Sequence, residues 1–149
     1  MSPTKRLDGK RKTIAVLGAQ LSRLADSEFM TGVLESAKTH DTNVIYFVGG
    51  KPAALTAHGM DRQSYGLYDL IKPEQFDGVL LTADMGHDTS ADEIRNFCSL
   101  FAPAPVASFA IQAEGVSSFM ADNTGGMRSI IRHLIEAHAY QRIAFVRGP

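Results

Sequence analysis

Short apolar runs rich in β-branched residues alternate along this chain with segments in which apolar residues recur at helical spacing. Five of these runs are interpreted as strands covered on both faces, at Thr13–Gly18, Asn43–Val48, Asp77–Leu81, Pro105–Phe109 and Ser118–Ala121. A sixth run, Arg142–Val146, closes the sequence. Strands that alternate with helices predict an α/β fold, with three α/β/α layers around a doubly wound, mainly parallel, flavodoxin-like sheet.

Helical spacing is strongest in two segments of the second half. Ser90 and Glu93 form a capping-box pattern, and the apolar residues after it recur at i, i+3, i+4 and i+7: Ile94, Phe97, Cys98 and Phe101. The best apolar stripe of the chain comprises Met127, Ile130, Ile131, Leu134 and Ile135. Further helices are predicted from about Asp26 to His40 and, less regularly, around Leu67–Ile71, ending at Lys72 before Pro73.

Composition excludes several classes of protein. A chain of 149 residues, 44% of them apolar, suits one globular domain. Its single cysteine excludes an internal disulfide framework and a cysteine-based zinc cluster. The apolar runs are too short to span a bilayer, and the net charge of -1 argues against a dedicated nucleic-acid-binding domain.

Positive charge is concentrated at the start of the chain. Residues 1–12 carry five Lys or Arg side chains against the single acidic residue Asp8, which predicts a basic flexible leader. The apolar stretch Thr13–Gly18 that follows is short and lacks a secretory cleavage pattern. We therefore predict a cytoplasmic protein without a membrane attachment.

Motifs for catalysis or cofactor binding are incomplete in this chain. Gln63–Gly66 lacks the first glycine of a nucleophile elbow, and Gly49–Pro52 lacks the hydroxyl residue that a P-loop needs for magnesium. The turn Gly18–Leu21 does not match the dinucleotide fingerprint, and Asp84 alone matches the acidic site of a phosphoacceptor receiver domain. The five histidines show no metal-ligand spacing. We predict a protein that is not an enzyme and holds no cofactor or metal.

The loops after the strands are the place to look for a binding site. In a doubly wound sheet the ligand crevice lies at the carboxyl ends of the strands. The corresponding loops are Ala19–Ser27, Gly49–Pro52, Ala83–Asp88, Ala110–Gly115 and Asp122–Asn123. A helix that begins at Asn123 would direct its free backbone N–H groups and the positive end of its dipole toward this crevice.

Several short motifs follow one another in a characteristic order: Asp77–Leu81, Pro105-Val106, Asp122–Gly126, His133–Ile135 and Arg142–Pro149. Over residues 13–149 this series resembles the effector-binding core of the LacI/GalR repressor family, a type 1 periplasmic-binding-protein fold. A narrower likeness is to the sensor modules joined to diguanylate cyclase (GGDEF) or histidine kinase outputs. It is carried by Phe47–Gly50, Tyr68–Ile71, Phe97-Cys98, Glu114-Gly115 and Gly126–Arg128.

The resemblance implies that residues 13–141 form the N-terminal lobe of a small-molecule sensor and that residues 142–149 cross toward a second lobe. A small polar metabolite, such as a sugar, would close the two lobes around a hinge near Asp122 and Arg147. This closure would change the geometry of a homodimer. The candidate ligand-binding residues are Gln20, Ser22, Arg23, Asp84, Asp122 and Asn123.

These candidates have different expected roles. Arg23 could pair with an anionic group of the ligand, whereas Asp84 or Asp122 could accept hydrogen bonds from sugar hydroxyls. The alternatives are that Asp122 and Asn123 only cap the helix that follows them and that Arg23 is solvated.

Three departures from the family pattern matter. No helix-turn-helix precedes residue 13, so direct contact of this chain with nucleic acid is not expected. Ala139-Tyr140 replaces the usual Gly-His before the last strand, so that turn is expected to differ. The family core is about twice this length. A second lobe is therefore expected outside this sequence, and residues 142–149 are expected to be disordered or paired with another chain.

Two alternative functions stay open at this point. One is the effector domain of a LacI-type transcriptional regulator without its helix-turn-helix. The other is a stand-alone flavodoxin-like enzyme or cofactor carrier.

Overall fold

The computed structural model describes residues 11–20, 28–52 and 66–146, and its sheet contains five strands within these ranges. They are β1 (Thr13–Gly18), β2 (Asn43–Val48), β3 (Gly78–Leu81), β4 (Val106–Phe109) and β5 (Ser117–Phe119). All neighbouring strands are parallel, in the order β2-β1-β3-β4-β5. This arrangement confirms the predicted α/β fold, and its strand order is that of flavodoxin-like sheets.

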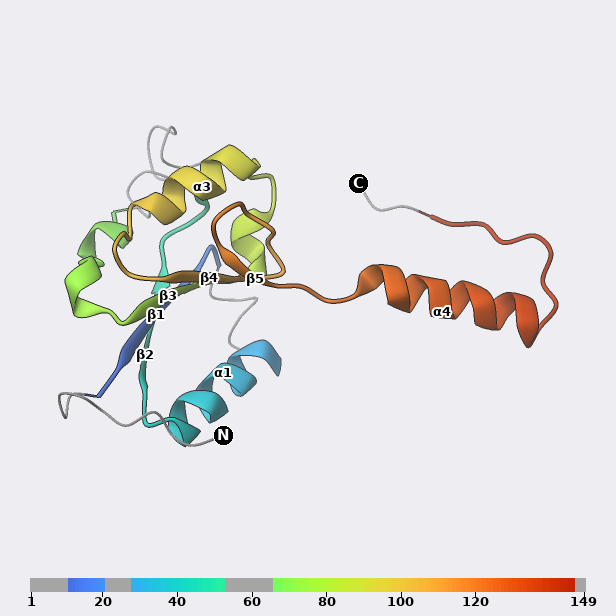
Figure 1. Cartoon of the computed structure of the whole chain (residues 1–149). Helices are drawn as coiled ribbons and strands as arrows, with labels where there is room; N and C mark the ends of the chain where they lie inside the picture. The colour runs from blue at the N-terminus through green and yellow to red at the C-terminus, as the bar shows by residue number, and fades with distance from the viewer. Residues whose placement is uncertain (1–10, 21–27, 53–65, 147–149) are drawn as a thin grey trace.

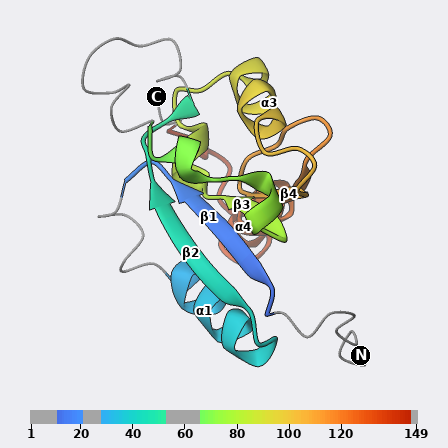
Figure 2. The same ribbon diagram turned by 90° about the vertical axis from the view of Figure 1, so that its left-hand side faces the viewer.

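The two faces of the sheet carry alternate residues of each strand. In β1, Ala15 and Leu17 point toward the core cluster that also contains residues of α3 (Ala91–Ser99). Ile14 faces the opposite side, where α1 (Glu28–Thr39) lies (Figures 1 and 2). Helices on both faces make the three layers that a parallel sheet requires.

The main core lies between the sheet and α3. The apolar face of α3 buries Ile94, Phe97 and Cys98, and the Phe97 ring meets Phe101 edge-on at a centroid distance of 5.1 Å. The predicted capping box is confirmed at its start. The Ser90 amide donates to the Glu93 carboxylate at 2.8 Å, and the Ser90 hydroxyl accepts from the Glu93 amide at 3.3 Å.

The predicted helix around Leu67–Ile71 is only a single 3₁₀ turn in the described residues. This turn, η3, comprises Tyr68–Leu70, and a second one, η4, comprises Pro73–Gln75. Ile71 is already extended, and helical geometry is disfavoured at Lys72, which directly precedes Pro73. The less regular helix predicted at this place is thus reduced to the turn η3 in the described residues.

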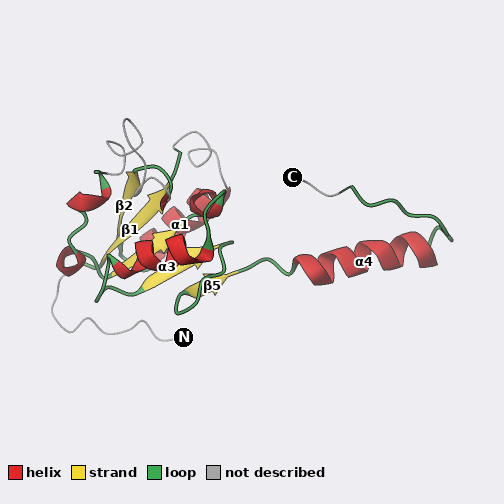
Figure 3. Ribbon diagram, turned by 90° about the horizontal axis from the view of Figure 1, so that it is seen from above, coloured by secondary structure: helices red, strands yellow, loops and turns green. Residues whose placement is uncertain are grey.

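The helix α4 (Asn123–Glu136) forms where the apolar stripe predicted it, but it stands apart from the sheet. Figures 1 and 3 show it beyond β5, at the end of a connection formed by Met120–Asp122. None of its residues is buried. The body built on the sheet therefore ends at β5, whereas the lobe predicted over residues 13–141 includes α4.

The predicted last strand does not form. Residues 142–146 have no regular structure, and Phe145 and Val146 are 69% and 91% exposed. A strand needs a neighbour for its backbone hydrogen bonds, and none of the described strands runs beside this segment. Arg147, the second hinge residue of the prediction, lies outside the described residues.

The turn after α4 has the left-handed geometry that commonly ends a helix. Ala139 has a φ of 54°, and its amide donates to the Ile135 carbonyl at 3.0 Å. The Ala139 bond is that of an αL helix end, and the Tyr140 amide donates further back, to the Leu134 carbonyl at 3.2 Å. Alanine adopts this left-handed conformation at a steric cost of about 1 kcal/mol, which glycine would avoid.

The single cysteine offers a direct test of the core. Burial raises the pKa of the Cys98 thiol to about 11. At pH 8 the thiolate fraction is then on the order of a hundredfold lower than that of a free cysteine. We expect Ellman's reagent to label the native chain at least about a hundredfold more slowly than the urea-unfolded chain. Labelling at the same rate in both states would mean that the face of α3 that carries Cys98 is not packed in the core.

Candidate functional site

The candidate site lies at the carboxyl edge of the sheet, between the ends of β1 and β3. The chain order reverses here, because β1 leads to β2 on one side and β3 lies on the other. In open parallel sheets the ligand crevice forms at such a switch point. Gln20, just after β1, and Asp84, just after β3, are therefore placed where a ligand is expected.

Asp84 holds the two loops of the switch point together. It lies in the short 3₁₀ turn η5 (Ala83–Gly86), and its Oδ2 accepts hydrogen bonds from the amides of Ala19 and Gln20, both at 3.0 Å. Its other oxygen accepts from the Thr82 hydroxyl. Three donors of the protein thus surround this carboxylate, and it fixes the path of the loop after β1.

A second tie joins the ends of β1 and β2. The Tyr68 ring is buried, and its hydroxyl lies 2.8 Å from the Gly50 carbonyl and 3.1 Å from the Gly18 carbonyl. The same hydroxyl accepts from the Gly49 amide at 3.2 Å. Because these backbone groups bind Tyr68, the carboxyl ends of β1 and β2 have a fixed separation.

Tyr46 brings a buried hydroxyl toward the same edge. Its oxygen has no hydrogen-bond partner of suitable geometry among the described residues. Burial, together with the nearby Asp84 charge, raises the pKa of Tyr46 to about 12, although the neighbouring Thr82 hydroxyl acts in the opposite direction. This phenol is therefore neutral, and it is a donor close to the switch point.

A hollow of about 430 Å³ opens beside η5, between the loops that follow β3 and β4. His87, Thr89 and Gln112 contribute polar groups to its lining, and Ile94 and Ile111 contribute apolar ones. Polar groups above an apolar floor suit a small polar molecule with a carbon skeleton.

An exposed polar cluster lies next to this hollow. Asp88 accepts from the Lys51 ammonium at 3.1 Å, and its carboxylate lies 2.7 Å from His87 Nδ1. Lys51 and, secondly, His87 lower the pKa of the Asp88 carboxyl. The cluster connects the loop after β2 with the loop after β3.

The other predicted residues are not brought to this place. Asp122 caps α4: its carboxylate accepts from the Gly125 amide at 2.8 Å. Asn123 is the first residue of α4 and is exposed, as is Asp122. Ser22 and Arg23 lie outside the described residues. Of the six predicted site residues, the structure thus unites Gln20 and Asp84.

Sequence reasoning missed Thr82, Tyr46 and Lys51 at this edge. The Thr82-x-Asp84 pattern directly after a buried strand is a local signal that could have identified Thr82. Tyr46 and Lys51 reach the edge through strand pairing, for which the sequence has no local signal.

The structure shows no group of three or more metal-ligating side chains within the described residues. In the same part of the chain, no helix is long and apolar enough to cross a membrane. Comparison of the sequence and structure with protein-family models, curated proteins and solved structures finds no match in any of the three.

The role of Asp84 can be tested against its neighbour Asp88. In the variant Asp84→Ala the Ala19 and Gln20 amides lose their acceptor, so we expect the free energy of unfolding to fall by about 2 kcal/mol in urea titrations. Asp88→Ala breaks only exposed pairs and should change stability little. Equal losses in the two variants would show that Asp84 does not anchor the loop.

The start of α4 contains a matched glycine pair. A Cβ at Gly125 would overlap the Asp122 carboxylate, whereas nothing lies within 4 Å of a Cβ at Gly126. We expect Gly125→Ala to destabilise the first turn by about 1 kcal/mol and Gly126→Ala to stabilise it by about 0.5–1 kcal/mol. Amide hydrogen exchange in α4 measures both, and faster exchange in Gly126→Ala would contradict the assignment.

Proposed function

We propose that this chain is a non-catalytic ligand-sensing domain of a bacterial regulatory or signal-transduction protein, of the LacI/GalR-like type. The observation that carries the proposal is the hollow at the carboxyl edge of the parallel sheet, next to the switch point at Gln20 and Asp84. Ligands of doubly wound folds bind at this edge. The polar side chains that line it, His87, Thr89 and Gln112, are hydrogen-bonding groups.

The chemistry of the edge favours an uncharged polar ligand, such as a sugar. Asp84 already occupies the amides of Ala19 and Gln20, which are the donors that a phosphate would use at this turn. The carboxylate also adds negative charge, which disfavours an anion. The amide of Gln112 and the side chains of His87 and Thr89 can donate to and accept from hydroxyl groups.

The strand order also favours a second candidate, a flavodoxin-like cofactor carrier. The occupied amides at Ala19 and Gln20 count against it, because flavin and nucleotide phosphates need free donors at this position.

A two-lobe sensor needs a joint, and the proposal places it at Asp122. The connection Met120–Asp122 leads from β5 to a helix that does not rest on the sheet (Figure 1). Closure around this joint would transmit binding to a homodimer and its output. The effector domain of a repressor-type regulator works by the same closure, so the proposal covers both outputs.

Thermal melts with a panel of compounds test the proposal. We expect a neutral sugar or polyol to raise Tm, by several degrees at a concentration of about 100 Kd. Gln112→Ala and His87→Ala should weaken this ligand at least about tenfold, because each removes a hydrogen bond in the hollow. Glu35→Ala, on the exposed face of α1, is the control and should leave affinity unchanged.

The panel includes FMN and nucleoside phosphates. Stabilisation by one of these, with none by neutral compounds, would contradict the sensor and support the cofactor carrier. A neutral ligand whose affinity is the same in Gln112→Ala, His87→Ala and the control would show that the hollow is not the site.

A further inference from the structure

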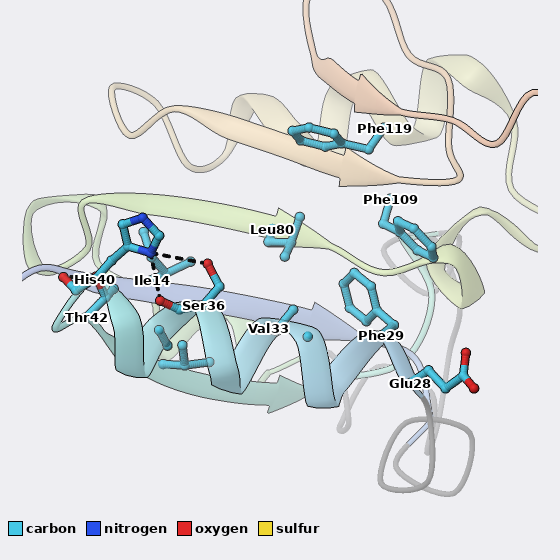
Figure 4. Close-up of a pocket in the computed structure, with 13 residues that line it drawn as sticks. Ile14, Glu28, Phe29, Val33, Ser36, His40, Thr42, Leu80, Phe109 and Phe119 are labelled. Carbon is cyan, nitrogen blue, oxygen red and sulfur yellow. Dashed lines mark hydrogen bonds between the residues drawn. The ribbon is translucent and has the colours of Figure 1, made fainter. Parts of the chain in front are cut away.

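A wide apolar groove runs along α1 on the face of the sheet opposite α3. It has a volume of about 840 Å³, and its apolar lining includes Ile14, Phe29, Val33, Leu80, Phe109 and Phe119 (Figure 4). Phe29 stacks on Phe109 at a ring-centroid distance of 4.4 Å and closes one end. Phe119 lies on β5, the edge strand of the sheet, and is 64% exposed. On this face α1 is the only helix among the described residues, and it meets β4 through the contact of Phe29 with Phe109.

In a doubly wound sheet, a second helix normally packs beside α1 on this face. A parallel sheet is stable when both faces are covered. On the α3 face, Leu81 is fully buried, whereas its neighbour Leu80, on the groove face, is only partly buried. One more amphipathic helix over β3–β5 would complete the layer.

The chain contains an unpartnered helix of the right kind. In α4 the stripe Met127, Ile130, Ile131, Leu134 and Ile135 follows helical spacing, and no residue of the helix is buried. With 14 residues α4 is about 21 Å long, close to the roughly 18 Å of the 12-residue α1 that borders the groove. The helix therefore matches the groove in length and in polarity.

The charges and the side-chain sizes of the groove also suit α4. Glu28 lines the groove at the start of α1, while Arg128 and Arg132 lie one turn apart on the flank of the α4 stripe. Gly32 and Ser36 are small residues one turn apart on the groove side of α1, and nothing lies within 4 Å of a Cβ at Gly32. Small residues at this spacing allow a second helix to approach closely.

We propose that α4 docks in this groove on a second copy of the chain, so that two copies exchange their α4 helices reciprocally. In the structure, Met120–Asp122 directs α4 away from its own sheet (Figure 3). Exchange keeps this connection as it is, whereas docking on the same chain requires it to reverse direction within three residues. Reciprocal exchange is a low-cost route to a symmetric dimer.

The buried area is sufficient for a stable dimer. Five stripe side chains that each lose about 60–100 Å² to the groove remove roughly 300–500 Å² of helix surface per copy, and the groove loses a similar area. The two contacts of the exchanged dimer then bury roughly 1,200–2,000 Å², the range of specific protein interfaces. This inference stands without the proposed ligand-sensing function.

Light scattering of the full chain tests the exchange. We expect the wild type to be a dimer at micromolar concentration. Gly32→Arg places a long charged side chain on the groove side of α1, where a Cβ meets nothing within 4 Å, and Ile130→Asp places a charge in the stripe of an exposed helix. Each variant should raise the dimer dissociation constant at least about tenfold. The matched controls Gly32→Ala and Ser129→Asp, the latter on the polar face of α4, should stay dimeric.

A mixing experiment identifies the occupant. In a mixture of Gly32→Arg with Ile130→Asp, the intact helix of the first chain can dock in the intact groove of the second, so heterodimers should form. The chain that carries both substitutions has neither surface and should not pair with itself. Amide exchange of each variant confirms that the sheet is folded.

Three results would overturn the proposal. A monomeric wild type, whether α4 is docked on its own sheet or free, excludes exchange between copies. If Ile130→Asp dissociates the dimer and Gly32→Arg does not, the two α4 stripes pack against each other instead of entering the groove. A dimer that neither substitution affects would use another surface.

Discussion

A parallel sheet must be covered on both faces, and the rest of this structure depends on how that requirement is met. The crossover connections between parallel strands place helices on the faces, so coverage and topology arise together. One face is complete: α3 and its aromatic side chains bury Leu17 and Leu81 fully. The other face carries α1 over β1 and β2 and leaves the groove over β3–β5. The same strands are therefore stably packed on one side and open to a partner helix on the other.

The carboxyl edge of the sheet is ordered by polar ties instead of apolar packing. Asp84 binds the amides after β1, and Tyr68 binds the backbone at the ends of β1 and β2. Each tie uses donors or acceptors that would otherwise be open to a ligand. The edge is thus preorganised, and the proposed function leaves the side chains of His87, Thr89 and Gln112 around the hollow as the groups that would bind. These side chains can exchange hydrogen bonds with the hydroxyl groups of a polar ligand.

The sequence predicts the fold better than the site, for a physical reason. Strands and helices have local periodicity, so the five strands and the Ser90 capping box could be predicted correctly. Leu67–Ile71 has the same kind of apolar spacing but is cut short by Pro73. The strand expected at 142–146 has the right residues, yet strand formation depends on a neighbour that local sequence does not specify. The apolar pattern of residues 142–146 therefore predicts a strand only if a neighbouring strand is present.

The positions of the site residues depend on contacts distant in sequence even more than the strands and helices do. Gln20 and Asp84 were predicted from their positions after strands, and topology does bring them together. The same reasoning could not tell that the Asp84 carboxylate binds backbone amides, because that depends on the exact register of β1 and β3. Tyr46 reaches the edge from β2 across β1, a path set by strand pairing alone. Asp122 has a local role, as the cap of α4, which the sequence did indicate as the alternative.

The short connection Met120–Asp122 links the two proposed properties of the molecule. Its first residue follows Phe119, which lines the groove, and its last residue caps α4. A ligand at the carboxyl edge that repositions this connection would also change the direction in which α4 leaves the sheet. Because this connection joins the exchanged helix to its own sheet, a small rotation at Asp122 would move the far end of a 21 Å helix by several ångströms, together with the partner's groove that holds it. Binding and assembly would then be coupled by geometry, without a continuous chain of packed side chains between them.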